Sequence, residues 1–132
     1  MAKNVAEQLV DTLEKAGVKR IYAVTGDSLN EVNEAVRKSG KIKWIHVRHE
    51  ETGAFAAAAE AQLNGELACC AGSSGPGHVH LINGLYDAQR SGAPVLAIAS
   101  TLPTHEFGTE YFQETNTIKL FEDCSYYNQV AT

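Results

Sequence analysis

The sequence predicts an α/β domain of three layers, in which helices cover both faces of a central parallel sheet. Short apolar segments with the character of buried strands alternate along the chain with longer segments of helical periodicity. Strands that are apolar throughout are typical of parallel sheets with both faces covered. The chain has 132 residues, 44% of them hydrophobic, which is the size and composition of one globular domain. We therefore expect a single domain over residues 1–132.

Four short apolar segments are expected to form the strands of the sheet. A fifth segment, near the end of the chain, is a weaker candidate. Because the first four are separated by helical segments, they are expected to run parallel, each joined to the next by a crossover. The five segments cover residues 21–24, 44–47, 67–71, 94–99 and 126–130.

The segments between the strands carry signals for the starts and ends of helices. Asn4 can cap the first helix and Gly17 can end it. Ser28 and Glu31 have the spacing of a capping box, which predicts that Ser28 opens the second helix. The alanine-rich run that follows Glu51 consists of strong helix formers and is closed by Asn64 and Gly65. The expected helices cover residues 5–16, 28–40, 51–63, 78–91 and 117–121.

The loops that follow the strands differ from the loops at the opposite ends. The segments TGDS, RHEE, GSSGPG and STLPTHEFGTEYFQE each come directly after an expected strand and hold most of the glycine-rich and ionisable loop residues. In an open parallel sheet, ligands bind beyond the carboxyl ends of the strands. The sequence therefore predicts a functional site at this edge of the sheet.

Charge, cysteine content and the start of the chain argue against several classes of protein. The formal net charge is −5 and the 11 Lys and Arg residues are scattered, which disfavours a nucleic-acid-binding surface. No apolar run approaches the length of a membrane span, and no secretion signal opens the chain, so we expect a cytoplasmic protein. Three cysteines, two of them adjacent, suggest neither a disulfide framework nor a metal-binding pair, and we expect reduced, buried thiols.

The segment GSSGPG at residues 72–77 allows several interpretations. It is not the dinucleotide-binding G-x-G-x-x-G, and it lacks the Gly-Lys-Ser/Thr of a phosphate-binding loop. It misses the spacing of a hydrolase elbow by one residue, so Ser74 is a poorly supported nucleophile. A tight turn in which Pro76 enters a helix explains most such segments. Its position beside RHEE is what favours a functional role.

Two histidines follow this turn. His78 and His80 are two residues apart, and side chains at that spacing do not share a helix face. We therefore expect no metal site in the chain. His80 alone could still reach a ligand.

The glutamates of RHEE are expected to differ in environment. Glu51 would lie in the first turn of the alanine-rich helix, where a carboxylate interacts favourably with the helix dipole. Glu50 lies one step nearer the strand, between apolar segments, and is expected to be partly buried. A buried carboxylate must be protonated or paired with a group that stabilises its charge. This is the profile of a catalytic group, and an ion pair with Arg48 is the structural alternative.

Taken together, the motifs resemble the N-terminal, pyrimidine-binding domain of thiamine diphosphate-dependent enzymes. The resemblance rests on VTGDSLN, RHEE, GSSGPG, HLINGL and FGTEYFQE at their separations in this chain, and it covers essentially all of it. Within that family, the chain is most similar to pyruvate oxidases and quinone-dependent pyruvate dehydrogenases. Acetolactate synthases and related decarboxylases share the first motifs.

The resemblance implies a role for Glu50. In the family, a glutamate at this place hydrogen-bonds N1′ of the aminopyrimidine ring of thiamine diphosphate, which favours the imino form of the ring and the removal of the C2 proton of the thiazolium. The cofactor supplies the carbanion chemistry, and the protein positions it. The implied reaction is oxidative decarboxylation of pyruvate, a 2-oxo acid, with electrons passed through FAD to a quinone or to oxygen.

The remaining site residues are also implied by the resemblance. His80 and Gln113 correspond to catalytic polar groups that face the reacting carbon. The others correspond to cofactor-binding residues that line the pyrimidine ring and the intermediate; they are Gly26, Gly75, Pro76 and Phe112.

Some parts of the family's machinery are missing from this chain. It contains no G-D-G followed by N-N, the segment that binds magnesium and the diphosphate in the family, and no FAD domain. In the family the cofactor lies between two subunits, so we expect a homo-oligomer, with membrane or quinone contact only through missing segments. We expect a truncation, a proteolytic remnant or a partial gene product of a longer enzyme, inactive by itself. The alternatives are an acetolactate synthase-like enzyme, a non-oxidative decarboxylase, or a standalone assembly or regulatory module without catalytic activity.

Overall fold

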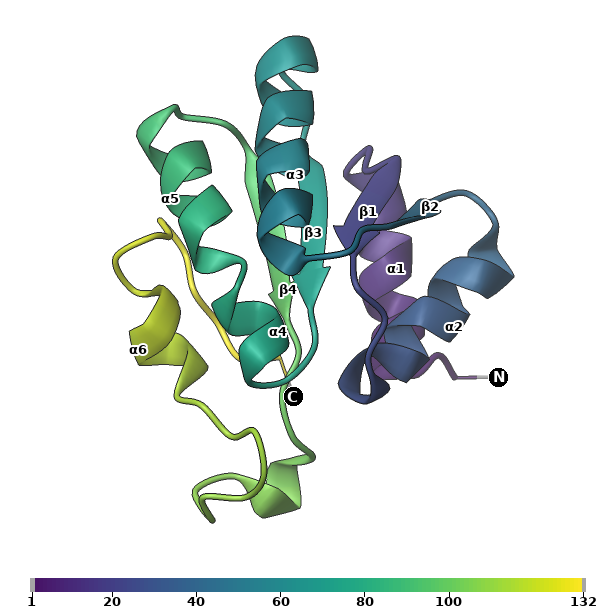
Figure 1. The fold of residues 1–132 in the computed structure, drawn as a ribbon. Coiled ribbons are helices and arrows are strands. Elements are labelled where there is room, and N and C mark those ends of the chain that lie inside the picture. The colour runs from purple at the N-terminus through teal and green to yellow at the C-terminus, as the bar shows by residue number, and fades with distance from the viewer. Residues whose placement is uncertain (1, 132) are drawn as a thin grey trace.

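Residues 2–131 are described by a computed structural model, in which a four-stranded parallel sheet lies between two layers of helices (Figure 1). The strand order is β2-β1-β3-β4, and every neighbouring pair is parallel. The strands are β1 (Arg20–Ala23), β2 (Lys43–His46), β3 (Ala68–Gly72) and β4 (Val95–Ala99). The predicted fold class and its four main strands are therefore confirmed, with ends that differ by at most one residue.

Six α-helices and two short 3₁₀-helices lie before, between and after the strands among the described residues. The helices α3 and α5 pack beside each other on one face of the sheet, and α1 and α2 cover the other (Figure 1). The α-helices are α1 (Val5–Lys15), α2 (Asn30–Ser39), α3 (Glu50–Asn64), α4 (Pro76–Val79), α5 (Ile82–Arg90) and α6 (Thr117–Phe121). The 3₁₀-helices are η1 (Asp27–Leu29) and η2 (Thr104–Glu106).

The sheet divides the core into two parts, and β3, one of its two inner strands, contributes side chains to both. All five of its residues are buried, and successive side chains of a strand point to opposite faces. Cys69 and Ala71 therefore join the core beneath α1 and α2, whereas Ala68 and Cys70 join the core beneath α3 and α5. This explains why the strand is apolar throughout, as a sheet covered on both faces requires.

Local signals fix several helix ends as expected. Asn4 caps α1 in a reciprocal capping box with Glu7, which satisfies backbone donors that have no partner within the helix. Gly65 ends α3 in the left-handed conformation, with φ of 70°, which glycine adopts without steric cost.

The start of the second helix differs from the prediction. Ser28 lies in η1, and α2 begins at Asn30 without a side-chain cap. The Ser28 hydroxyl instead lies 2.8 Å from Ser73 Oγ and accepts a hydrogen bond from the Ser74 backbone N–H. The capping box was wrong because this side chain is used by a loop from another strand.

The predicted helix over residues 78–91 is divided into α4 and α5. The backbone N–H of Leu81 donates to the carbonyl of His78, 3.2 Å away, which is the three-residue step of a 3₁₀ turn. This step separates the two helices and places His80 between them.

The candidate strand over residues 126–130 is not formed. Tyr126 and Tyr127 are 87% and 81% exposed, and the segment joins none of the ladders of the described sheet. The two tyrosines at its start extend into solvent instead of packing on the sheet. None of the helices within residues 2–131 combines the length and hydrophobicity needed to cross a bilayer.

Candidate active site

Glu50 occupies the junction between β2 and α3, at the carboxyl edge of the sheet. It is the first residue of α3 and is only 9% exposed. The N-terminus of a helix favours a negative charge because its first backbone N–H groups point outward. The residue is thus a carboxylate that is largely shielded from water, as the sequence predicted, and it also has the helix N-terminus that the sequence analysis had assigned to Glu51.

The partner of Glu50 in this structure is His80. Glu50 Oε2 lies 3.0 Å from His80 Nδ1, and the two residues come from separate elements, α3 and the link between α4 and α5. The alternative partner, Arg48, forms no ion pair with Glu50 within the described chain. The structure therefore pairs Glu50 with His80 and not with Arg48.

The other oxygen of Glu50 faces the glycine-rich turn. A Cβ added to Gly77 would lie 3.4 Å from Glu50 Oε1, so the turn presents backbone rather than a side chain to the carboxylate. Glu51 has a different environment, because it accepts a hydrogen bond of 2.6 Å from the Asn83 side chain in α5. The two adjacent glutamates therefore have separate partners, and Glu50 alone of the two is buried.

His49 is an additional site residue that the sequence analysis did not select. Its ring stacks on that of His80 with centroids 4.4 Å apart and an angle of 25° between the planes. The side chains of both histidines are nearly half exposed. The sequence offered no signal for this pair, because the two residues are brought together only by the packing of α3 against the segment before α5.

The turn GSSGPG is compact because its glycines permit close contacts. Gly75 has φ of 63°, a conformation that favours glycine, and a Cβ there would lie 2.8 Å from Gln113 Cβ. Pro76 occupies the first turn of α4, as predicted. A Cβ on Gly26 would overlap the Ser73 side chain. Gly26 and Gly75 therefore allow the loops after β1, β3 and β4 to meet.

Gln113 and Phe112 belong to the long loop after β4. Gln113 Oε1 accepts a hydrogen bond of 3.2 Å from Ser74 Oγ, and Gln113 has a positive φ of 66°. Phe112 is 74% exposed. The structure therefore brings Gln113 against the glycine-rich turn, whereas the Phe112 side chain extends into solvent; the roles assigned to both stay predictions.

His78 has a structural position that the sequence analysis did not predict. Its side chain is fully buried, and Nδ1 lies 2.8 Å from the Ser100 carbonyl oxygen. A carbonyl only accepts, so Nδ1 carries the proton and Nε2 accepts from the Thr115 hydroxyl, 2.5 Å away. Burial lowers the pKa of His78, which keeps the ring neutral. His78 therefore joins the loop after β3 to both ends of the loop after β4.

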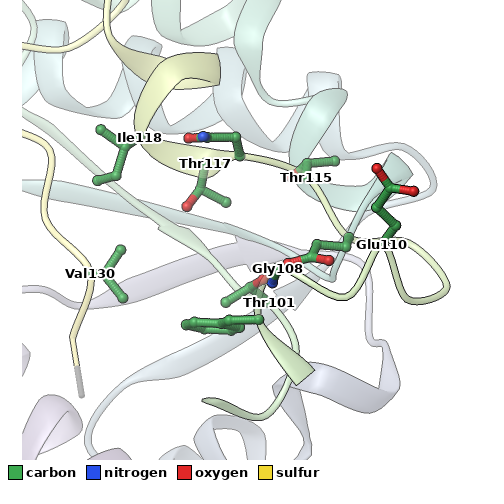
Figure 2. A pocket seen from close by; sticks show the side chains of 10 residues that line it. Thr101, Gly108, Glu110, Thr115, Thr117, Ile118 and Val130 are labelled. Carbon is green, nitrogen blue, oxygen red and sulfur yellow. Dashed lines mark hydrogen bonds between the residues drawn. The ribbon is translucent and has the colours of Figure 1, made fainter. Parts of the chain in front are cut away.

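A separate hollow of about 640 Å³ lies beside the carboxyl edge of the sheet. It is formed by the loop after β4, by α6 and by the segment near the C-terminus, and Figure 2 shows Ile118 and Val130 among its apolar side chains and Glu110 among its acidic ones. Neither Glu50 nor His80 lines this hollow. We therefore place the candidate site at Glu50 and not here.

Comparison with known proteins gives a consistent family assignment. Residues 3–120 match the family model described as thiamine pyrophosphate enzyme, N-terminal TPP binding domain. An uncharacterized 42.6 kDa protein from the isoamylase 3′ region of Pseudomonas amyloderamosa is 59% identical over 97% of this chain and 32% of its own length.

Two relatives with named activities are also similar. The pyruvate oxidase of Lactiplantibacillus plantarum is 42% identical over 93% of this chain and 21% of its own length. Acetolactate synthase 3 of Brassica napus is 35% identical over 96% of this chain and 19% of its own length. The chain thus spans about a third or less of the curated relatives that it matches.

Proposed function

Because the chain belongs to the thiamine pyrophosphate enzymes, as their N-terminal cofactor-binding domain, we propose that its complete enzyme decarboxylates pyruvate oxidatively and passes the electrons through FAD to a quinone or to oxygen. The observation that carries the proposal is the buried carboxylate of Glu50 at the N-terminus of α3. The similarity to a pyruvate oxidase, 42% identical, supports pyruvate as the 2-oxo acid.

The residues around Glu50 fit the aminopyrimidine end of thiamine diphosphate. His80 Nδ1 is hydrogen-bonded to Oε2 of the Glu50 carboxylate, whereas Oε1 faces the backbone of Gly77. A flat heterocycle could approach that oxygen past Gly77, which has no side chain of its own. When bound, the cofactor supplies the carbon nucleophile and holds the electrons released with carbon dioxide.

In this proposal, Glu50 holds or releases a proton at Oε1, in contact with the ring nitrogen N1′. His80 donates from Nδ1 to Oε2, which orients the carboxylate and stabilises its charge. The low exposure of Glu50 excludes water that would otherwise compete for the same proton. The carboxylate is thus the proton-transfer group, and His80 positions it.

The other assigned residues complete the proposed site. Gly26, Gly75 and Pro76 form a wall of backbone beside the ring, and Gln113 with Phe112 would face the substrate from the loop after β4. Gln113 is held against the wall by its bond to Ser74. His80, nearly half exposed at its side chain, is also within reach of the substrate in this arrangement.

Magnesium, FAD and the diphosphate would be bound outside this chain. We propose that a partner subunit, in a homo-oligomer, completes the cofactor site and that the 132-residue chain alone is inactive. The complete enzyme would work in the cytoplasm, with quinone or membrane contact through segments beyond this domain.

Acetolactate synthesis is the second candidate function. The similarity to a plant acetolactate synthase, 35% identical over nearly the same residues, favours it. Both reactions begin with the same proton transfer at Glu50 and differ in whether the two-carbon unit is oxidised or joined to a second 2-oxo acid.

Product analysis on the complete enzyme distinguishes the two functions. We expect pyruvate with ferricyanide to yield acetate and carbon dioxide, with two ferricyanide ions reduced for each pyruvate consumed, because the oxidation releases two electrons. Glu50→Gln should lower this rate by about 10²-fold or more, whereas Glu51→Gln should retain most of it. Acetolactate as the main product, without reduction of ferricyanide, would exclude the oxidase in favour of the synthase.

A further inference from the structure

His49, Glu50 and His80 form a cluster of potential metal ligands. Each offers one ligand atom, and the three atoms lie within 4.8 Å of one another. The residues come from the loop before α3, from the first position of α3 and from the link between α4 and α5. These are two imidazoles and one carboxylate, a donor set that suits first-row transition metals such as Zn²⁺ better than Mg²⁺, which prefers oxygen ligands.

The ligand atoms of Glu50 and His80 are almost as far apart as two ligands of a tetrahedral Zn²⁺ ion. Glu50 Oε2 and His80 Nδ1 are 3.0 Å apart. Ligands about 2.0–2.2 Å from a tetrahedral Zn²⁺ lie roughly 3.3 Å from each other, so an ion could replace the proton between these atoms after a small displacement. Glu50 is buried and His80 is held by the turn between two helices, so this pair is already ordered.

The third ligand, His49, is adjacent to this pair. His49 stacks on His80, is nearly half exposed, and does not cap the helix that it precedes. Its position is therefore explained neither by burial nor by helix capping. Glu51 Oε2 lies 3.8 Å from His49 Nδ1, where a carboxylate could orient the ring as outer partners of metal-bound histidines do.

We propose that His49, Glu50 and His80 bind a divalent transition-metal ion of the Zn²⁺ class, with water in the remaining coordination position. The ion would use the same carboxylate as the aminopyrimidine ring. This consequence rests on the proposed function: the ion and the cofactor would exclude each other, and such ions would inhibit the complete enzyme.

Calorimetric titration of the 132-residue chain with ZnCl₂ tests the site without cofactor or substrate. We expect one ion per chain, no measurable binding of MgCl₂, and affinity for Zn²⁺ about tenfold or more weaker in His49→Ala and in His80→Ala. His105→Ala is the matched control, because His105 lies in η2 and outside the cluster, and it should bind as the unaltered chain does.

Both outcomes of this titration are decisive. Absence of Zn²⁺ binding, or binding that is equally strong in His49→Ala and His80→Ala, would overturn the site. His49 is exposed, so its variant is expected to fold, which circular dichroism verifies. The result is independent of the proposed function, whose test requires the complete enzyme and pyruvate.

Discussion

Cys69 and Cys70 are adjacent in β3, and both thiols are fully buried. Burial raises the pKa of Cys70 to about 12 and that of Cys69 well above its ordinary value. The thiolate is the reactive form of cysteine, so neither residue is a nucleophile or redox centre in the folded protein. The expectation of reduced, buried thiols is confirmed for these two and for Cys124.

The raised pKa of Cys70 predicts a loss of stability at alkaline pH. Above about pH 9 the thiol ionises in the unfolded chain but stays protonated in the folded one until about pH 12. The unfolded state then binds fewer protons, so the free energy of unfolding falls as pH rises, by about 1.4 kcal/mol per pH unit for one such group. In Cys70→Ala the decline should be shallower by about that amount.

Urea denaturation of both proteins at a series of alkaline pH values measures this difference. Cys124→Ala serves for comparison, because burial raises the pKa of Cys124 as well but that residue packs at the edge of the core, beside α6. Equal slopes for Cys70→Ala and the unaltered chain would show that the Cys70 thiol is accessible to solvent.

The contact between α3 and α5 is the main packing feature on the site's side of the sheet. Gly84 in α5 lies against Ala54 in α3, and a Cβ on Gly84 would lie 2.5 Å from Ala54 Cβ. Ala54 is one helical turn beyond Glu50, so the close approach of the helices also determines where the carboxylate sits. His80, two residues before α5, depends on the same contact.

Gly84→Ala is therefore expected to destabilise the fold. Overpacking typically costs about 1–3 kcal/mol, and the gain in helix propensity offsets at most about 1 kcal/mol, so at the upper end of that cost the net loss is about 2 kcal/mol. Asp87→Ala on the exposed side of α5 is the control, since it raises helix propensity without a steric clash. Equal or greater stability of Gly84→Ala in urea denaturation would contradict the packing described here.

The elements show which parts of the structure local sequence signals can predict. The cap at Asn4, the glycine after α3 and the four strands depend on neighbouring residues and were predicted, although only β3 is buried along its whole length. Ser28 was misassigned because its hydroxyl bonds to Ser73 and Ser74, 45 and 46 positions away. Local rules do not detect such contacts.

In the candidate site, too, features that depend on neighbouring residues were predicted and contacts between distant residues were not. The low exposure of Glu50 was predicted from its place between two apolar segments, although the preceding strand β2 is itself only partly buried. Its partner His80 is 30 positions away, and the sequence analysis named only Arg48 as a partner within the chain. The stacking of His49 on His80 and the bonds of His78 likewise depend on how α3, α4 and the loop after β4 pack together.

The whole molecule presents its site at an open edge of the sheet. The loops that follow all four strands meet at this edge. The chain spans about a third or less of the length of its curated relatives. This arrangement is expected of a domain that supplies one end of a cofactor site. In our proposal, the remainder of the enzyme and a partner subunit supply the other end.

The most direct test of this account is the rate of deuterium exchange at C2 of thiamine diphosphate bound to the complete enzyme. We expect Glu50→Gln to slow exchange by about 10²-fold or more, because an amide cannot accept and return the proton of N1′, while cofactor binding persists. Glu51→Gln, whose side chain contacts Asn83 instead, should exchange at the normal rate. Normal exchange in Glu50→Gln would contradict the assignment of Glu50 as the proton-transfer group.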